Sequence, residues 1–149
     1  MVKITDRTII DRPVEEVWSF VSDPGNVPKW YQGTAEVRQR SEGPTAVGTT
    51  FEAVIQFGSR SLVTGARCLV LNPNKEVTWE FTSGLMKRST DCWRMEPIDE
   101  KSTRLTRVFD MRVSGFWRLI QPIVVRGTKR AHEAEINNVK RFLEGEPQV

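Results

Sequence analysis

One arginine of the chain has neighbours that a charged side chain usually avoids. Arg107 alternates with apolar residues on one face of a predicted strand. These apolar neighbours are Leu105, Phe109 and Met111. If the face is turned inward, the guanidinium loses its hydration, which is costly unless a carboxylate pairs with it. A ligand carboxylate is one candidate partner, and those within the chain are Asp6, Glu52 and Asp91. A bulge or a place on the strand rim would instead leave Arg107 in solvent.

Acid–base chemistry has several candidate residues but no motif. The single histidine, His132, could act as a general base, because an unperturbed imidazole titrates at about pH 6.5. Its place on an apolar helical stripe equally favours a packed or rim position. Four other polar side chains could also move protons: Arg107, Tyr31, Asp6 and Asp91. With one histidine, spacing alone indicates no Ser–His–Asp or Cys–His arrangement.

The sequence carries no cofactor or metal motif. It has 2 cysteines and 1 histidine, too few for a zinc site made from these residue types alone, although a carboxylate-rich site stays open. A glycine-rich phosphate loop is also missing. We therefore expect neither a metal nor a cofactor. Cys68 and Cys92 are expected to be buried free thiols in a reducing compartment, with a disulfide between them as the open alternative.

Basic residues concentrate in the last third of the chain. Residues 1–100 hold 12 basic and 14 acidic residues, whereas residues 101–149 hold 10 basic and 5 acidic ones. One interpretation is a solvated basic face. The other is attraction to an anion, either a carboxylated ligand, an anionic membrane surface or nucleic acid. We expect no nucleic-acid partner, because the sequence lacks a basic–aromatic motif, a zinc finger and a helix-turn-helix signal.

Hydrophobic periodicity and turn signals predict an α+β domain that spans residues 1–149. A strand at Val2–Ile10 is followed by a helix at Val14–Val21, with Pro13 at its start, and by a short helix around Val27–Tyr31. Six further strands are predicted at residues 34–40, 49–58, 61–71, 76–82, 89–98 and 103–113. Short turns between them indicate an antiparallel meander.

A long helix is predicted from Phe116 to Leu143, with two apolar stripes about 160° apart on an ideal helical wheel. Pro122 marks either a kink or the true start of this helix.

The sequence has no apolar run of about eighteen residues, so we expect no membrane span. Charges where a signal peptide needs its apolar core predict a cytoplasmic protein.

Two motifs near the N-terminus indicate a family. The segment Ile10–Phe20, followed by Asp23, resembles the opening I-x-x-P-x-E-x-V-W-x-x-x-x-D, and Asn26–Trp30 resembles N-x-P-x-W. With the element order, these motifs resemble the START/Bet v 1-like (SRPBCC) superfamily and its polyketide cyclase/dehydrase-like branch. The resemblance implies a helix-grip fold, in which a curved antiparallel sheet of about six to seven strands wraps a long C-terminal helix. It also implies two short helices after the first strand and a cavity between sheet and long helix.

The resemblance favours a ligand pocket over a plain packed core for the aromatic residues of the sheet. Aromatic and methionine side chains suit adaptable contact with flat or oily ligands. Small residues on the long helix would widen the same space. The expected cavity-lining residues are Trp30, Ile55, Phe57, Trp79, Phe81, Trp93, Arg107, Phe109, Met111, Ile120, Ile123, Gly127 and Ala131.

Three functions remain open at this point. The first is binding of a hydrophobic or amphipathic small molecule, a lipid or a polyketide-like compound, with Arg107 as the main orienting group. The second is a cofactor-free polyketide cyclase, aromatase or dehydratase, which the resemblance supports. The third is a lipid carrier that docks on anionic membranes through the basic last third. Paired polar groups converging on the cavity would favour the enzyme, and a mostly apolar lining would favour the binding protein.

Overall fold

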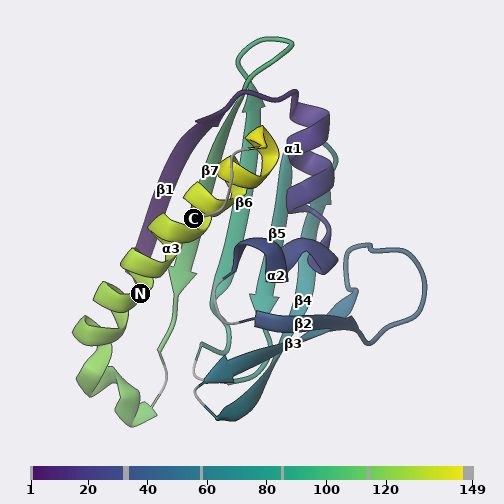
Figure 1. The fold of residues 1–149 in the computed structure, drawn as a ribbon. Coiled ribbons are helices and arrows are strands. Elements are labelled where there is room, and N and C mark those ends of the chain that lie inside the picture. The colour runs from purple at the N-terminus through teal and green to yellow at the C-terminus, as the bar shows by residue number, and fades with distance from the viewer. Residues whose placement is uncertain (1, 32–33, 58, 85, 114, 146–149) are drawn as a thin grey trace.

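The structure of the chain is a computed structural model that describes residues 2–31, 34–57, 59–84, 86–113 and 115–145. Within these residues, seven strands form one antiparallel sheet (Figure 1). The strands are β1 (Val2–Ile10), β2 (Thr34–Gln39), β3 (Thr50–Phe57), β4 (Arg60–Asn72), β5 (Glu76–Phe81), β6 (Thr90–Pro97) and β7 (Thr103–Met111). The helices are α1 (Val14–Val21), α2 (Val27–Trp30) and α3 (Gln121–Glu144), with 3₁₀ turns η1 (Pro24–Asn26) and η2 (Gly115–Ile120).

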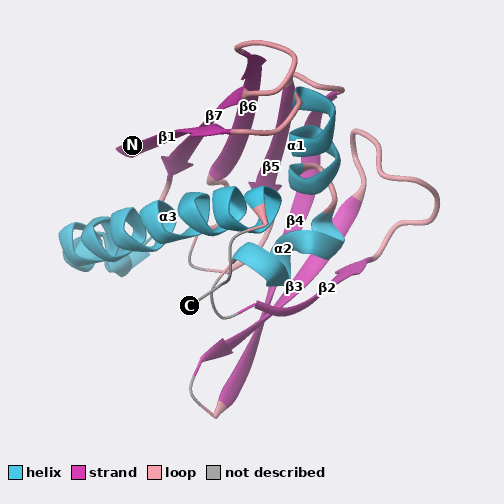
Figure 2. Cartoon of the chain, turned by 45° about the horizontal axis from the view of Figure 1, so that its top comes forward, coloured by secondary structure: helices cyan, strands magenta, loops and turns pink. Residues whose placement is uncertain are grey.

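The order of the strands is β1-β7-β6-β5-β4-β3-β2. Every strand from β2 to β6 pairs with the next one along the chain, as the short turns predict, and β1 pairs with β7. Helix α3 packs against β1, α1 against β6 and α2 against β2, and both short helices also contact α3. Figure 2 shows the three helices over one face of the sheet. The predicted helix-grip fold is confirmed.

Helix α3 begins later than the periodicity suggests. The sequence predicts a helix from Phe116, but the α-helix starts at Gln121, and residues 115–120 form the 3₁₀ turn η2. Pro122 therefore stands in the first turn of α3 and marks its true start rather than a kink. A proline fits there because the first N–H groups of a helix have no intrahelical partner to lose. At the other helix, Pro13 precedes α1 instead of beginning it.

Only one of the two predicted apolar stripes of α3 faces the sheet. The buried residues of the helix are His132, Glu135, Ile136 and Val139, which lie from its middle onward. Ile136 and Val139 join the larger core cluster, which also holds residues of α1, α2 and strands β1, β5, β6 and β7. A smaller cluster near the other end of β1 and β7 consists of Ile4, Phe109, Met111 and Val113. The stripe of the first half is uncovered, with Ile123 73% exposed.

The two cysteines are buried free thiols, as predicted, so the alternative of a disulfide between them is wrong. Burial raises the pKa of both the Cys68 and the Cys92 thiol. These thiols are therefore held in the protonated form in the folded chain.

Among the described residues, no helix is long and apolar enough to cross a membrane.

Candidate functional site

A mostly apolar cavity lies between the short helices and the middle of the sheet. Its volume is about 90 Å³. Residues from η1, α2 and the strands β2 to β6 line it: Pro24, Val27, Trp30, Tyr31, Val37, Phe51, Ala53, Ile55, Thr64, Ala66, Trp79, Phe81 and Asp91. A cavity of this volume suits one ring or a short alkyl segment, because sites for whole drug-sized ligands have about 300 Å³ or more.

The alternation of β3 produces one wall of the cavity. Phe51, Ala53 and Ile55 are two residues apart, so their side chains point to the same side of the strand. Across the strand pair, Ala66 of β4 lies opposite Phe51. Alanine carries only a methyl group, so Ala53 and Ala66 leave space beside the larger side chains. The ring of Trp79 packs edge to face against that of Phe51, with centroids 5.5 Å apart.

Asp91 is the one lining residue of this cavity with a formal charge, and it is paired with Arg107. Arg107 Nε donates to Oδ1 of Asp91 at 2.8 Å, and Nη2 donates to Oδ2 at 2.7 Å. The third guanidinium nitrogen, Nη1, donates to Oε1 of Glu135 at 2.8 Å. Arg107 is 1% exposed, so its face of β7 does point inward. The partner is therefore a pair of carboxylates from β6 and α3, which satisfies the buried charge.

Two indole rings flank the same guanidinium. Its central carbon lies 4.6 Å from the ring centroid of Trp93 and 5.4 Å from that of Trp30. The two rings contact each other edge to face, with centroids 5.1 Å apart. A cation over an aromatic face is favourable, more so when water is excluded. Trp30 thus lines the cavity on one side and covers Arg107, so the ion cluster lies directly behind the cavity wall.

The environment shifts the pKa values of the groups around Arg107. Burial raises the pKa of Glu135 to about 7, against the opposing effect of Arg107. Burial, helped by Arg107, lowers the pKa of His132 to about 4, so its imidazole is neutral near pH 7. Burial also raises the pKa of Asp6. Arg107 itself stays charged, because Asp91 and Glu135 outweigh burial and raise its pKa.

Tyr31 is the second titratable group of the cavity wall. Burial, with a smaller contribution from the Glu135 carboxylate, raises its pKa to about 12. Its hydroxyl therefore keeps its proton and can donate a hydrogen bond. Together, Tyr31 and Asp91 offer a donor and an acceptor to a polar group of a ligand.

Among the described residues, no cluster of three or more His, Cys, Asp or Glu side chains is arranged to hold a metal ion.

Comparison with known proteins adds to this geometry. A family model described as polyketide cyclase / dehydrase and lipid transport matches residues 1–144. The chain belongs to this family. A comparison with curated protein sequences finds no significant match.

Solved structures share the fold of this family member at low identity. The Zhui aromatase/cyclase from Streptomyces sp. R1128 is 16% identical with a TM-score of 0.77, over 96% of this chain and 93% of that one. Norcoclaurine synthase from Thalictrum flavum is 14% identical with a TM-score of 0.70, over 99% and 89%. The di-domain aromatase/cyclase BexL from the BE-7585A biosynthetic pathway is 16% identical with a TM-score of 0.78. The match covers 97% of this chain but 47% of BexL.

The cavity of this family member takes in four of the residues expected to line it, and nine others. The four are Trp30, Ile55, Trp79 and Phe81. Among the nine, Phe51 and Ala53 follow the same alternation as Ile55, which is the signal that could have identified them. Nothing in the sequence indicates that Val37 or the residues of η1 close the other side, because their approach depends on how the short helices fold back. The side chain of Phe57 lies outside the described part of the structure.

Eight expected lining residues are not among those that line this cavity. Four are buried beside α3 instead of facing the cavity: Trp93, Arg107, Phe109 and Met111. They lie on β6 and β7, where α3 already fills the space over the sheet; the ring of Phe109, for example, stacks edge to face on His132 at 4.8 Å. The other four are on or next to the first half of α3, three of them exposed and Ala131 half-buried: Ile120, Ile123, Gly127 and Ala131. They belong to the stripe that the sheet does not cover.

Glu135 is the member of the ion cluster that sequence reasoning missed. It is 2% exposed and lies three residues after His132 and four before Val139, which is the spacing of one helical face. A glutamate within a buried stripe indicates a buried cation opposite it. The other proposed partners of Arg107 do not pair with it: Glu52 pairs with Arg40, and Asp6 affects only its electrostatic surroundings.

Proposed function

We propose that the protein binds a hydrophobic or amphipathic small molecule, a lipid or a polyketide-like compound, in the cavity between α2 and strands β3 to β5. The observation that carries the proposal is the composition of the wall. All lining residues are apolar except three: Tyr31, Thr64 and Asp91. An apolar lining with a few fixed polar groups is typical of small-molecule sites.

The polar groups favour a ligand with a neutral hydroxyl over one with a carboxylate. Arg107 already donates to two carboxylates, so it does not need an anionic ligand. Asp91, which faces the cavity, would repel a second carboxylate and accept a hydrogen bond from a hydroxyl. The proposal gives Asp91, which lines the cavity, the orienting role that the sequence-based expectation gave to Arg107.

The apolar part of the ligand provides the remaining affinity. Burying roughly 100 Å² of apolar surface contributes about 2.5 kcal/mol before ordering costs. That is modest, so a tightly bound ligand would need contacts at the cavity mouth in addition to those inside. A phenol or an alcohol with one ring or a short chain inserted is the smallest ligand that uses both kinds of contact.

Fluorescence titration tests the proposal. Trp30 and Trp79 line the cavity, so a bound ligand changes the emission of the protein. Flat phenols, long-chain alcohols, sterols and fatty acids are added in turn, and we expect phenols or alcohols to bind more tightly than fatty acids of equal length. Ala53→Leu should fill the cavity and abolish binding, whereas Ala46→Leu in an exposed loop should leave it unchanged. No binding below millimolar concentration, or equal binding by both variants, would refute the site.

A second candidate, the cofactor-free cyclase or dehydratase, is favoured by the pair of Tyr31 and Asp91 in one wall. Asp91 could accept a proton from an acidic C–H or O–H group, while the Tyr31 hydroxyl donates to a carbonyl oxygen. The family description suggests polyketide substrates. If the protein is such an enzyme, Tyr31→Phe should lower turnover of a poly-β-ketone thioester by tenfold or more while ligand affinity changes little. Equal turnover in the presence and absence of the protein leaves only the binding function.

A further inference from the structure

The first half of α3 and the preceding η2 turn expose apolar side chains. Leu119 is 86% exposed, Ile123 is 73% exposed and Ile120 is 38% exposed. In Figure 1 and in Figure 2, these first turns extend beyond the part of α3 that lies beside β7 and α2. Large apolar side chains that gather at one end of an exposed helix are a typical feature of interaction surfaces.

The charged residues of the same segment are all basic. Residues 115–132 contain Arg118, Arg126, Lys129 and Arg130 and no Asp or Glu. None of the four forms an ion pair with a described carboxylate. Several exposed arginines of the sheet are paired, for example Arg67 with Glu80. The positive charge at this end of α3 is therefore not neutralised by the protein itself.

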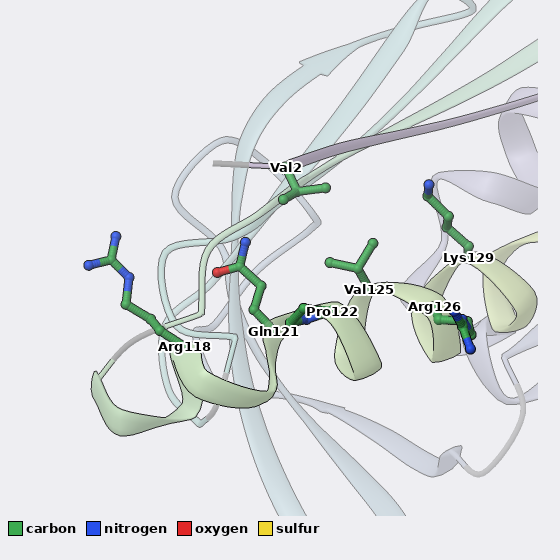
Figure 3. Close-up of a pocket in the computed structure, with 7 residues that line it drawn as sticks. All are labelled: Val2, Arg118, Gln121, Pro122, Val125, Arg126 and Lys129. Carbon is green, nitrogen blue, oxygen red and sulfur yellow. The ribbon is translucent and has the colours of Figure 1, made fainter.

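Ile123 shares one face of the helix with two of the basic residues. Ile123, Arg126 and Arg130 follow i, i+3, i+7 spacing, which places them on one face. Beside this face is an open groove of about 650 Å³ between the helix and Val2 of β1. Figure 3 shows Arg118 at one end of the groove and Lys129 at the other, with no acidic residue among the lining side chains.

We propose that this end of α3 docks on the surface of an anionic lipid bilayer. The α3 docking surface comprises Arg118, Leu119, Ile123, Arg126, Lys129 and Arg130. Its basic groups contact lipid phosphates and carboxylates, and its two apolar side chains enter the boundary between headgroups and acyl chains. Amphipathic helices with basic residues beside exposed leucine and isoleucine bind membranes in this way, through apolar burial and electrostatic attraction together.

The combination of the two residue types favours a bilayer over other occupants. A soluble phosphate or a nucleic acid would use the basic groups but leave Leu119 and Ile123 in water. A second copy of the chain, packed symmetrically, would cover the apolar residues but bring four unpaired cations against four others, which is repulsive. A bilayer with anionic headgroups complements both. None of these residues lines the cavity, so the proposal does not depend on the proposed function.

Vesicle co-sedimentation tests the docking surface. The full chain is mixed with vesicles of phosphatidylcholine alone, or of phosphatidylcholine with about one third phosphatidylserine. We expect binding to the second kind only, and loss of binding at high salt, because screening shortens the electrostatic range from about 10 Å at 0.1 M to about 3 Å at 1 M. Free phosphoserine at millimolar concentration should not compete, since it offers no surface for the apolar residues.

Two variants and two matched controls separate the contributions. The triple variant Arg126→Gln, Lys129→Gln, Arg130→Gln should weaken vesicle binding about 100-fold, because each basic residue near an anionic surface contributes about fivefold. Its control changes the same net charge on the sheet, by Arg7→Gln, Arg94→Gln and Arg104→Gln. The double variant Leu119→Ser, Ile123→Ser should weaken binding about tenfold. Its control is Leu62→Ser, Val63→Ser, which removes exposed apolar side chains from β4.

Each outcome decides the proposal. Binding that requires phosphatidylserine and is lost in both α3 variants but kept in both controls supports it. Equal binding to phosphatidylcholine alone, no binding to anionic vesicles at low salt, or equal loss in the controls overturns it. So does a dimer that Leu119→Ser, Ile123→Ser converts to a monomer, because the surface would then be a contact between copies. Ala53→Leu should bind vesicles normally, so failure of the cavity and failure of the docking surface are distinguishable.

Discussion

The two halves of α3 use their side chains in opposite ways. The second half buries Ile136 and Val139 in the main core and inserts Glu135 into the ion cluster of Arg107. The first half leaves Ile123 in solvent, as the preceding η2 turn leaves Leu119, and its charged residues are all basic. The second half is therefore held in the main core, whereas the first half packs on the smaller cluster through Val124 and Val125 and leaves Ile123 uncovered. Leu119 and Ile123 contribute little to the core, so they are the apolar residues to test for contacts with a partner or a membrane.

The largest expected effect comes from breaking the ion cluster beside the packed half. Arg107→Ala would leave Asp91 and Glu135 buried without their cation, which costs about 3–5 kcal/mol of unfolding free energy. Urea denaturation would measure it, with Arg104→Ala on the same strand as the control. Arg104 is exposed and pairs only loosely with Glu96, so its removal should cost about 1 kcal/mol or less. Equal losses in the two variants would contradict the account of the buried cluster.

The same substitution in each half tests the comparison directly. Ile136→Ala removes a side chain that is 3% exposed and should cost about 2–5 kcal/mol, because it leaves a cavity in the core. Ile123→Ala removes one that is 73% exposed and should change stability by about 0.5 kcal/mol or less. Thermal and urea denaturation would measure both. If Ile123→Ala were as destabilising as Ile136→Ala, the Ile123 side of α3 would be packed in solution and the docking surface would lose its basis.

The pH dependence of stability should come from two buried groups of α3 with opposing contributions. Glu135 has a folded pKa of about 7, above its ordinary 4.5, so the folded state keeps a proton that the unfolded chain has released, and stability falls as pH rises between these values. His132 has a folded pKa of about 4, below its ordinary 6.5, so its contribution rises with pH in that window. Between pH 4.5 and 6.5 the two partly cancel.

Single variants should separate these two contributions. Glu135→Gln should make stability rise with pH between 4.5 and 6.5, and His132→Asn should make it fall, each by at most about 1.4 kcal/mol per pH unit. Urea midpoints at four pH values would measure both slopes. Arg107, Asp91 and Asp6 remain in each variant, so a slope of the wrong sign would mean that these neighbours, and not the substituted group, dominate.

The smallest expected effect concerns Gly127 in the uncovered half. A Cβ added there meets no described atom within 4 Å, so Gly127→Ala should stabilise the protein by about 0.5–1 kcal/mol through helix propensity. The sequence suggested instead that this glycine widens the ligand cavity. If that were its role, the alanine variant would weaken ligand binding in the fluorescence titration, whereas the structure leads us to expect unchanged affinity.

The fold could be predicted from the sequence because its signals are local. The Pro13–Trp18 motif, the alternation in β3 and the turns between strands each involve neighbouring residues. The candidate site depends on contacts between distant segments, and those are less accessible. The inward position of Arg107 follows from alternation, but its pairing with Glu135 joins β7 to a helix 28 residues later. Which of the two stripes of α3 faces the sheet depends on the rotation of the whole helix, which no local pattern determines.

The two alanines in the cavity wall make the interior adjustable. Ala53 and Ala66 stand on paired strands whose backbone hydrogen bonds do not depend on side-chain size. Enlarging or shrinking either residue would change the volume offered to a guest while the strands stay in register. Descendants of one ancestral scaffold could therefore diverge toward different guests through single substitutions, which is compatible with architectures that stay alike at 16% identity.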